Sequence, residues 1–239
     1  MAAPSKSISN APRDAPGRGG RLVWDLPLRL THWLLVFTVA GAWATHYAGT
    51  QWFEWHERLG YATLVLVAFR IAWGFVGTRH ARFLNFLRGP GRVAEYLRNR
   101  GRPEPAGHSP VGALSVVALL GLLLVQAATG LFSNDEIANA GPFYGWVSQQ
   151  TSNRITGFHE TNSNLLLALL GLHLVAIAWY SFVARKPLVR AMLTGRKDVP
   201  PGESIEGSRM ALAVAILVAL AVALALAIRA APEATIALF

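Results

Sequence analysis

The chain has 239 residues, of which 53% are hydrophobic and only 15% are charged, and its mean hydropathy is +0.35. A soluble domain carries about 25% charged residues, so this composition favours a protein embedded in lipid. The absence of cysteine excludes disulfides, thiolate metal sites, iron–sulfur clusters and covalent attachment of haem through Cys-x-x-Cys-His. The formal net charge of +9 would indicate binding to nucleic acid only if the cations were not concentrated on one side of a membrane.

Five segments are apolar enough to cross a bilayer, for which about 20 residues suffice. In chain order they are Leu30–Tyr47, Leu59–Val76, Val111–Phe132, Leu165–Val183 and Met210–Ile228. Of all the Lys, Arg, Asp and Glu residues, only Arg70 falls inside one of them. We therefore expect an all-α integral membrane protein with five transmembrane helices.

The segments between the spans are polar and differ in character. Residues 1–22 are rich in Ala, Pro, Ser and Gly and are predicted to form a disordered cytoplasmic tail. The first helix is expected to open at Asp25–Leu26–Pro27, an acidic N-cap followed by proline in the first turn. The connection 82–102 is predicted to be amphipathic and interfacial, with a break at Gly89–Pro90–Gly91. Residues 133–158 are predicted to form a polar loop.

The cations are distributed very unevenly between the two sides of the predicted membrane. Eighteen of the 22 Lys and Arg residues lie in the segments 1–29, 77–110 and 184–209, which all fall on one side. The positive-inside rule places that side in the cytoplasm, with the N-terminus inside and the C-terminus outside. The basic charge is thus explained by topology, and we expect the lipid bilayer and no nucleic acid as a partner.

Two of the spans each carry a pair of histidines 14 residues apart, His32 with His46 and His159 with His173. Fourteen residues fall about 40° short of four helical turns and rise roughly 21 Å. Each pair therefore shares one helix face, with one histidine near each leaflet. Ionisable residues inside a membrane are costly, which makes them functional candidates.

The predicted topology sorts the histidines into two levels. His32 and His173 form the inner level, and His159 lies at the outer level with His56 as the favoured partner and His46 as the alternative. Neutral imidazoles on facing helices hold low-spin b-type haem, so two stacked bis-histidine haems are the favoured interpretation. A proton pathway, a metal-ion transporter and purely structural histidines are the alternatives, although metal transport would favour carboxylates in the spans, which hold none.

Arg70 lies 14 residues after His56 and is expected on the same face at the inner level. A buried guanidinium needs an anion, for which we expect a propionate of the inner haem. The alternative is snorkelling to the inner headgroups. Gly60 and Gly171 could clear room for a flat macrocycle or only allow close packing of helices.

The third and fifth spans carry no histidine. The third span holds Gln126 and Thr129 and is expected to close a four-helix haem-binding bundle. The fifth is almost wholly Ala, Leu, Val and Ile and is expected to face lipid. The predicted organisation is a tail (residues 1–22), a four-helix domain (residues 23–200), and a linker, fifth helix and short periplasmic tail (residues 201–239).

Seven short motifs follow one another between residues 23 and 197. They are Val23–Trp24–Asp25–Leu26–Pro27–Leu28–Arg29 with His32–Trp33, Trp55–His56–Glu57, Gly77–Thr78–Arg79–His80–Ala81–Arg82–Phe83, Gly107–His108–Ser109–Pro110, Phe158–His159–Glu160, Leu172–His173 and Met192–Leu193–Thr194–Gly195–Arg196–Lys197. Together they resemble the bacterial cytochrome b-561 family, which is related to the b subunit of nickel–iron hydrogenases. The fifth helix is a departure from the smallest members of that family.

The resemblance implies a four-helix bundle that holds two b haems. By position it implies four axial ligands, with His46 outside the set: His32, His56, His159 and His173. It places His80 and His108 in the inner connection, where they would brace the loop or lie near a quinone or proton route.

The function expected on these grounds is that of a di-haem b-type cytochrome, multi-pass in the bacterial inner membrane. It would transfer electrons between the quinone pool, ubiquinone or menaquinone, and a periplasmic redox partner such as a cytochrome c. One alternative is an oxidoreductase that reacts with superoxide or quinone. Others are the membrane anchor subunit of a hydrogenase or dehydrogenase, and a haem-free transporter or scaffold. Whether the chain has quinone oxidoreductase activity of its own stays open.

Overall fold

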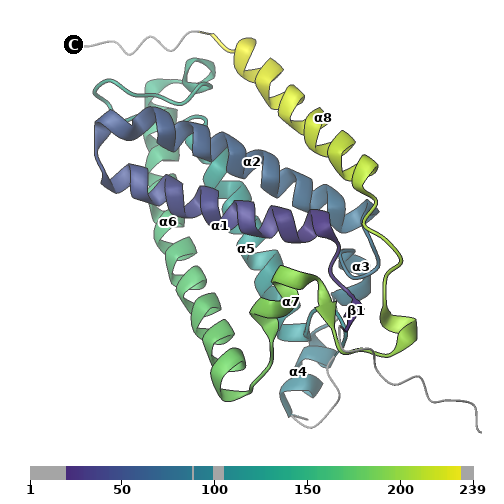
Figure 1. Cartoon of the computed structure of the whole chain (residues 1–239). Helices are drawn as coiled ribbons and strands as arrows, with labels where there is room; N and C mark the ends of the chain where they lie inside the picture. Colours follow the sequence, from purple (N-terminus) through teal and green to yellow (C-terminus); the bar gives the residue numbers. More distant parts are fainter. Residues whose placement is uncertain (1–19, 88, 99–104, 233–239) are drawn as a thin grey trace, which may run out of the picture.

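The computed structural model describes residues 20–87, 89–98 and 105–232, and these residues are mostly helical (Figure 1). Its long helices are α1 (Leu26–Tyr47), α2 (Phe53–Val76), α5 (Pro110–Gly130), α6 (Gln149–Ala178) and α8 (Met210–Arg229). The short elements are β1 (Arg21–Leu22), α3 (Phe83–Phe86), α4 (Pro90–Arg98), α7 (Leu188–Thr194), β2 (Arg196–Lys197), 3₁₀ turns at Thr50–Trp52, Tyr144–Trp146 and Pro201–Glu203, and a π-helical turn at Trp179–Val183. The predicted all-α class is confirmed.

Four helices in the described part of the chain are long and apolar enough to cross a membrane. They span Thr50–Val76, Pro110–Gly130, Gln149–Val183 and Met210–Arg229. The first predicted span, α1, has 22 residues but is not among the four, because polar residues such as Arg29, His32 and His46 lower its hydropathy. Figure 1 shows α1 running antiparallel beside α2 along much of its length. Its crossing of the membrane stays a prediction.

Helix starts follow local capping signals. The Asp25 carboxylate accepts the Leu28 N–H at 2.8 Å, so α1 opens where the sequence predicts. The break at Gly89–Pro90–Gly91 is also confirmed, since α4 begins at Pro90. In contrast, α6 begins at Gln149, far before the apolar segment, because Ser148 caps it and a polar stretch continues the helix. The loop predicted over residues 133–158 is therefore shorter than expected.

The bundle helices pack as an open arc. Close contacts join α1 to α2, α2 to α5, and α5 to α6, whereas α8 packs against α2 and, to a smaller extent, α1. Between α1 and α6 the Trp43 indole N–H donates to Ser163 Oγ at 3.2 Å, but these two helices make no comparable packing contact. The side of the arc between α1 and α6 is therefore not closed by helix packing.

Four of the sequence motifs, those around Asp25, Thr78, Gly107 and Gly195, gather at one end of the bundle, which the cation distribution predicts to be the cytoplasmic end. β1 pairs antiparallel with β2, with Arg21 opposite Lys197. Arg21 and Leu22 are thus ordered, and the tail predicted over residues 1–22 ends before them; residues 1–19 lie outside the described part. The Gly195 carbonyl then accepts the N–H groups of Val23 and Trp24, at 2.8 and 3.0 Å.

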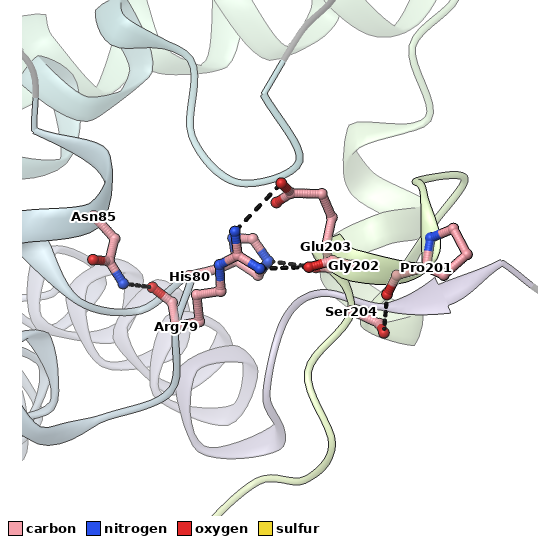
Figure 2. A network of polar contacts seen from close by, with 7 residues as sticks. All are labelled: Arg79, His80, Asn85, Pro201, Gly202, Glu203 and Ser204. Atoms are coloured by element: carbon pink, nitrogen blue, oxygen red, sulfur yellow. Dashed lines mark hydrogen bonds and ion pairs between the residues drawn. The ribbon is translucent and has the colours of Figure 1, made fainter.

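A second set of contacts ties the segment before α8 to the end of α2 (Figure 2). Arg79 donates to the Gly202 carbonyl at 2.5 Å and forms an ion pair with Glu203 at 3.3 Å. His80 Nε2–H donates to the Glu203 carbonyl at 2.7 Å. These contacts match the bracing role suggested for His80.

Asp25 is the buried polar centre of this end. Only 1% of the residue is exposed, and besides capping α1 it accepts from Trp73 Nε1 at 3.1 Å and from Thr78 Oγ1 at 2.5 Å. It thereby joins α1, α2 and the loop after α2. Sequence alone indicated only the cap.

We expect Asp25→Asn to lower the free energy of unfolding by about 2 kcal/mol, because charge-assisted hydrogen bonds are lost in a buried setting. Thermal unfolding of the protein in detergent measures the change. Asp198→Asn is the matched control, since Asp198 is exposed on the same end. Equal stability of the two variants would contradict a structural role for Asp25.

Candidate functional site

The outer histidines come from three helices. His159 on α6 lies near enough to His56 on α2 and His46 on α1 for their charges to interact. The rings of His46 and His56 are 5.8 Å apart. His56 and His159 are half-buried, whereas His46 is exposed. The structure therefore brings together all three histidines that the sequence assigned to this level.

Hydrogen bonds orient two of these three rings. His56 Nδ1–H donates to the Ala42 carbonyl on α1 at 2.8 Å. His159 Nδ1 lies 3.0 Å from Thr129 Oγ1, and since that hydroxyl donates to the Val125 carbonyl at 2.7 Å, it accepts from the imidazole. Both rings then carry the proton on Nδ1 and keep a lone pair on Nε2. This is the tautomer that an imidazole needs to bind a metal through Nε2.

Polar residues on α5 and α6 surround Nε2 of His159. The Gln126 amide donates to that nitrogen at 2.8 Å, and Gln126 Oε1 accepts from Asn162 Nδ2 at 2.7 Å. Asn162 also donates to the Leu122 carbonyl at 3.0 Å. In this structure the Nε2 lone pair is thus held by a side chain that can rotate away.

These contacts reveal residues that sequence reasoning missed. Gln126 and Thr129 were expected only to close the bundle, yet both reach His159 from α5. The available signal was their spacing of three residues in an otherwise apolar span, which places two polar side chains on one helix face. Asn162, three residues after His159, follows the same rule.

The inner histidines also form a pair across the open side of the arc. His32 on α1 and His173 on α6 are both half-buried and close enough for their charges to interact. Since α1 and α6 do not pack closely, this interaction spans the side of the arc where the two helices stay apart. The predicted inner pairing is therefore compatible with the fold.

Arg70 is buried on α2 with its charge uncompensated. Only 6% of the residue is exposed, and neither Nη1 nor Nη2 has a hydrogen-bond partner. The acid whose charge reaches it is Asp25, but both Asp25 oxygens already accept from other groups. The guanidinium lies over the Phe83 ring, 5.2 Å from its centroid. Such a group is stable only with a further anion.

His108, just before α5, belongs to the same end. Its ring centroid lies 4.7 Å from Trp24 and 4.4 Å from Phe86. Burial, together with the nearby positive charges of Arg70 and Lys197, lowers the pKa of His108 to about 3. The imidazole is therefore neutral at pH 7.

These side chains fit a b-type haem at each level. Histidines on different helices lie near one another in pairs, and the pair predicted for the outer level carries the tautomer with the lone pair on Nε2, which iron needs and which Gln126 now holds at His159. The unpartnered Nη1 and Nη2 of Arg70 match the carboxylates that haem carries. A Cβ at Gly60 or Gly171 would meet nothing within 4 Å, so there is open space beside α2 and α6 near the histidines.

A separate hollow of about 710 Å³ lies at the start of α6. It is lined by Ser148, Gln149, Gln150, Asn153 and Arg154. No histidine lines it, and Arg154 is its one cation. It therefore does not provide the cationic funnel that a superoxide-reactive outer haem would need.

The fold and the paired histidines define a class, the integral membrane b-type cytochromes of electron transfer. Residues 23–195 match the family model of the prokaryotic cytochrome b561, and the chain belongs to that family. It is 23% identical over 209 residues to a protein of Rhizobium leguminosarum bv. viciae described as a probable Ni/Fe-hydrogenase B-type cytochrome subunit, covering 73% of this chain and 87% of the relative. No solved structure matches the chain.

Proposed function

We propose that the protein holds two b haems stacked across the bacterial inner membrane and passes electrons between the quinone pool and a redox partner on the outer side. His32 and His173 ligate the inner haem, and His56 and His159 the outer haem. Residues 23–200 form the haem-binding unit, and residues 201–239 add a linker and α8.

The observation that carries this proposal is the pairing of four half-buried histidines at two levels. The ligand choice at the outer level is supported by hydrogen bonding. His56 Nδ1–H is fixed by the Ala42 carbonyl, whereas His46 is exposed at the end of α1. A fixed imidazole loses less conformational entropy on binding iron, so His56 is the better ligand.

When bound, each b haem supplies a one-electron carrier. The protein provides axial imidazoles, a low-dielectric surrounding and a positive charge. Thr129 and Ala42 hold the outer imidazoles in the required tautomer. Gln126 releases His159 Nε2 when the site is filled, and Arg70 neutralises a propionate at the inner level.

A reduced-minus-oxidised visible spectrum, with haem extracted and counted per polypeptide, tests the proposal on the detergent-purified protein. We expect a b-type spectrum and two non-covalent haems per chain. One haem per chain would contradict the stacked arrangement. A fully assembled but colourless protein would overturn the cytochrome assignment of this chain.

We expect Thr129→Val to weaken binding of the outer haem by about 10- to 100-fold, because His159 Nδ1–H loses its acceptor. The rate of haem transfer to excess apomyoglobin measures this loss. Thr129→Ser keeps the hydroxyl and is expected to retain the haem. Equal haem loss from the valine and serine variants would mean that Thr129 acts only through packing.

The relative from Rhizobium leguminosarum favours a second candidate for the partner. Because that protein is described as a hydrogenase subunit, this chain could serve as the membrane subunit of a hydrogenase or dehydrogenase instead of meeting a cytochrome c. Purification from native membranes in mild detergent separates the two possibilities. A large periplasmic subunit in stoichiometric amount supports the anchor role, and reduction or oxidation by soluble cytochrome c supports the other.

A further inference from the structure

The cluster around His108 contains a buried imidazole nitrogen without a partner. Although the residue is partly exposed, its Nδ1 is enclosed and makes no hydrogen bond. A buried imidazole nitrogen that lacks a partner is unfavourable, because it has given up its hydrogen bond to water. Trp24 and Phe86 contact the ring and hold it in place.

The same cluster contains the uncompensated guanidinium of Arg70. Arg70 lies over Phe83, whose ring centroid is 5.6 Å from that of Phe86, and Phe86 in turn packs on His108. The charges of Arg70 and His32 both act on His108, so the three side chains lie near one another. The unpartnered nitrogens of Arg70 and His108 therefore lie near His32, the proposed ligand of the inner haem.

Other charged groups nearby are already engaged. Lys197 Nζ donates to the carbonyls of Ala106 and Gly107, at 2.9 and 3.3 Å, and lies over the Trp24 ring. Both oxygens of the Asp25 carboxylate already accept hydrogen bonds, from Leu28 N–H, Trp73 and Thr78. The group that would satisfy Arg70 and His108 together is an anion with oxygen acceptors, and haem brings two carboxylates to this level.

We propose that His108 is a positioning residue for the inner haem, donating its Nδ1–H to one propionate while Arg70 pairs with a propionate beside it. This inference rests on the proposed function, since it requires a haem ligated by His32 and His173. It assigns a binding role to a residue whose place was predicted only as a brace or part of a quinone or proton route.

The test is a potentiometric titration of the two-haem protein with His108→Phe, which fills the same space between Trp24 and Phe86 without a donor. The inner haem is identified as the component absent from the His173→Ala protein. Loss of the donor leaves more negative charge on the propionate, which favours ferric haem. We expect the reduced-to-oxidised ratio of the inner haem to fall about tenfold at a fixed potential, which is 59 mV for one electron.

Two further variants separate donation from packing. In His108→Asn, the amide Nδ2 can donate from nearly the position of Nδ1, so the inner potential is expected to return toward the wild-type value. His80→Gln is the control from the same cluster, since a glutamine amide can still donate to the Glu203 carbonyl, and both potentials should stay unchanged. If the phenylalanine variant does not assemble, His108→Leu takes its place.

The outcomes distinguish this inference from the proposed function. A wild-type protein with fewer than two haems contradicts the proposed function, whatever His108 does. Two haems whose potentials are unchanged in the phenylalanine or leucine variant overturn the role of His108 alone. A shift confined to the outer haem, or equal shifts in the asparagine and phenylalanine variants, also overturns it.

Discussion

His173→Ala is expected to lower the haem content of the purified protein from two to one per chain. A low-spin b haem needs two axial imidazoles, and without His173 the inner iron keeps only His32. The fold should largely survive, because α6 packs on α5 independently of His173. Haem extraction per polypeptide, together with the low-spin signals in electron paramagnetic resonance, measures the loss.

His46→Ala is the matched control for this experiment. His46 also lies on a bundle helix within reach of the other histidines, but it is exposed and is not needed if His56 ligates the outer haem. We expect two haems in this variant. Two haems per chain in His173→Ala would show that the assignment of His173 as an inner ligand is wrong. Loss of the outer haem in His46→Ala would show that His46, and not His56, ligates that haem.

Arg70→Met is expected to have opposite effects on the empty and the haem-loaded protein. Without haem, the substitution removes a buried charge whose Nη1 and Nη2 have no partner, and should stabilise the fold by about 1–4 kcal/mol. With haem, the propionate loses its cation. A haem with one positive charge fewer beside it is easier to oxidise, so the inner potential should fall by on the order of 100 mV, or about 2.3 kcal/mol for one electron.

Thermal unfolding of the apoprotein and potentiometric titration of the holoprotein measure the two effects. Arg82→Met is the matched control, because Arg82 is exposed in the loop that follows α2. It should change neither quantity. A stabilised apoprotein with an unchanged inner potential would mean that the Arg70 guanidinium does not face a propionate.

What the sequence could predict depended on how local the signal was. The opening of α1 follows from Asp25 and Pro27, two residues inside one turn, and it was predicted correctly. The start of α6 was missed because its first residues are polar, and an apolar window cannot detect a helix that Ser148 caps outside that window. Helical periodicity and hydropathy thus located the apolar segments, but they did not reveal the polar N-terminal extension of α6.

Contacts between distant segments were beyond sequence reasoning. The second role of Asp25 depends on Trp73 and Thr78, which lie 48 and 53 residues further along the chain. The pairing of β1 with β2 joins segments about 175 residues apart and has no periodic signal at two residues each. For the site, the 14-residue spacing predicted which histidines share a helix face, and the topology predicted their levels, whereas the ring orientation set by Thr129 and Ala42 required the folded backbone.

The open side of the bundle, between α1 and α6, has a consequence for how the protein matures. Elsewhere in the arc neighbouring helices hold each other, but along this side the bond from Trp43 to Ser163 is the polar contact that links them. A cofactor ligated from both helices would hold α1 and α6 together and so complete the bundle. The freshly inserted chain should then be most vulnerable to membrane proteases along α6, and haem supply, more than translation, should determine how much protein accumulates.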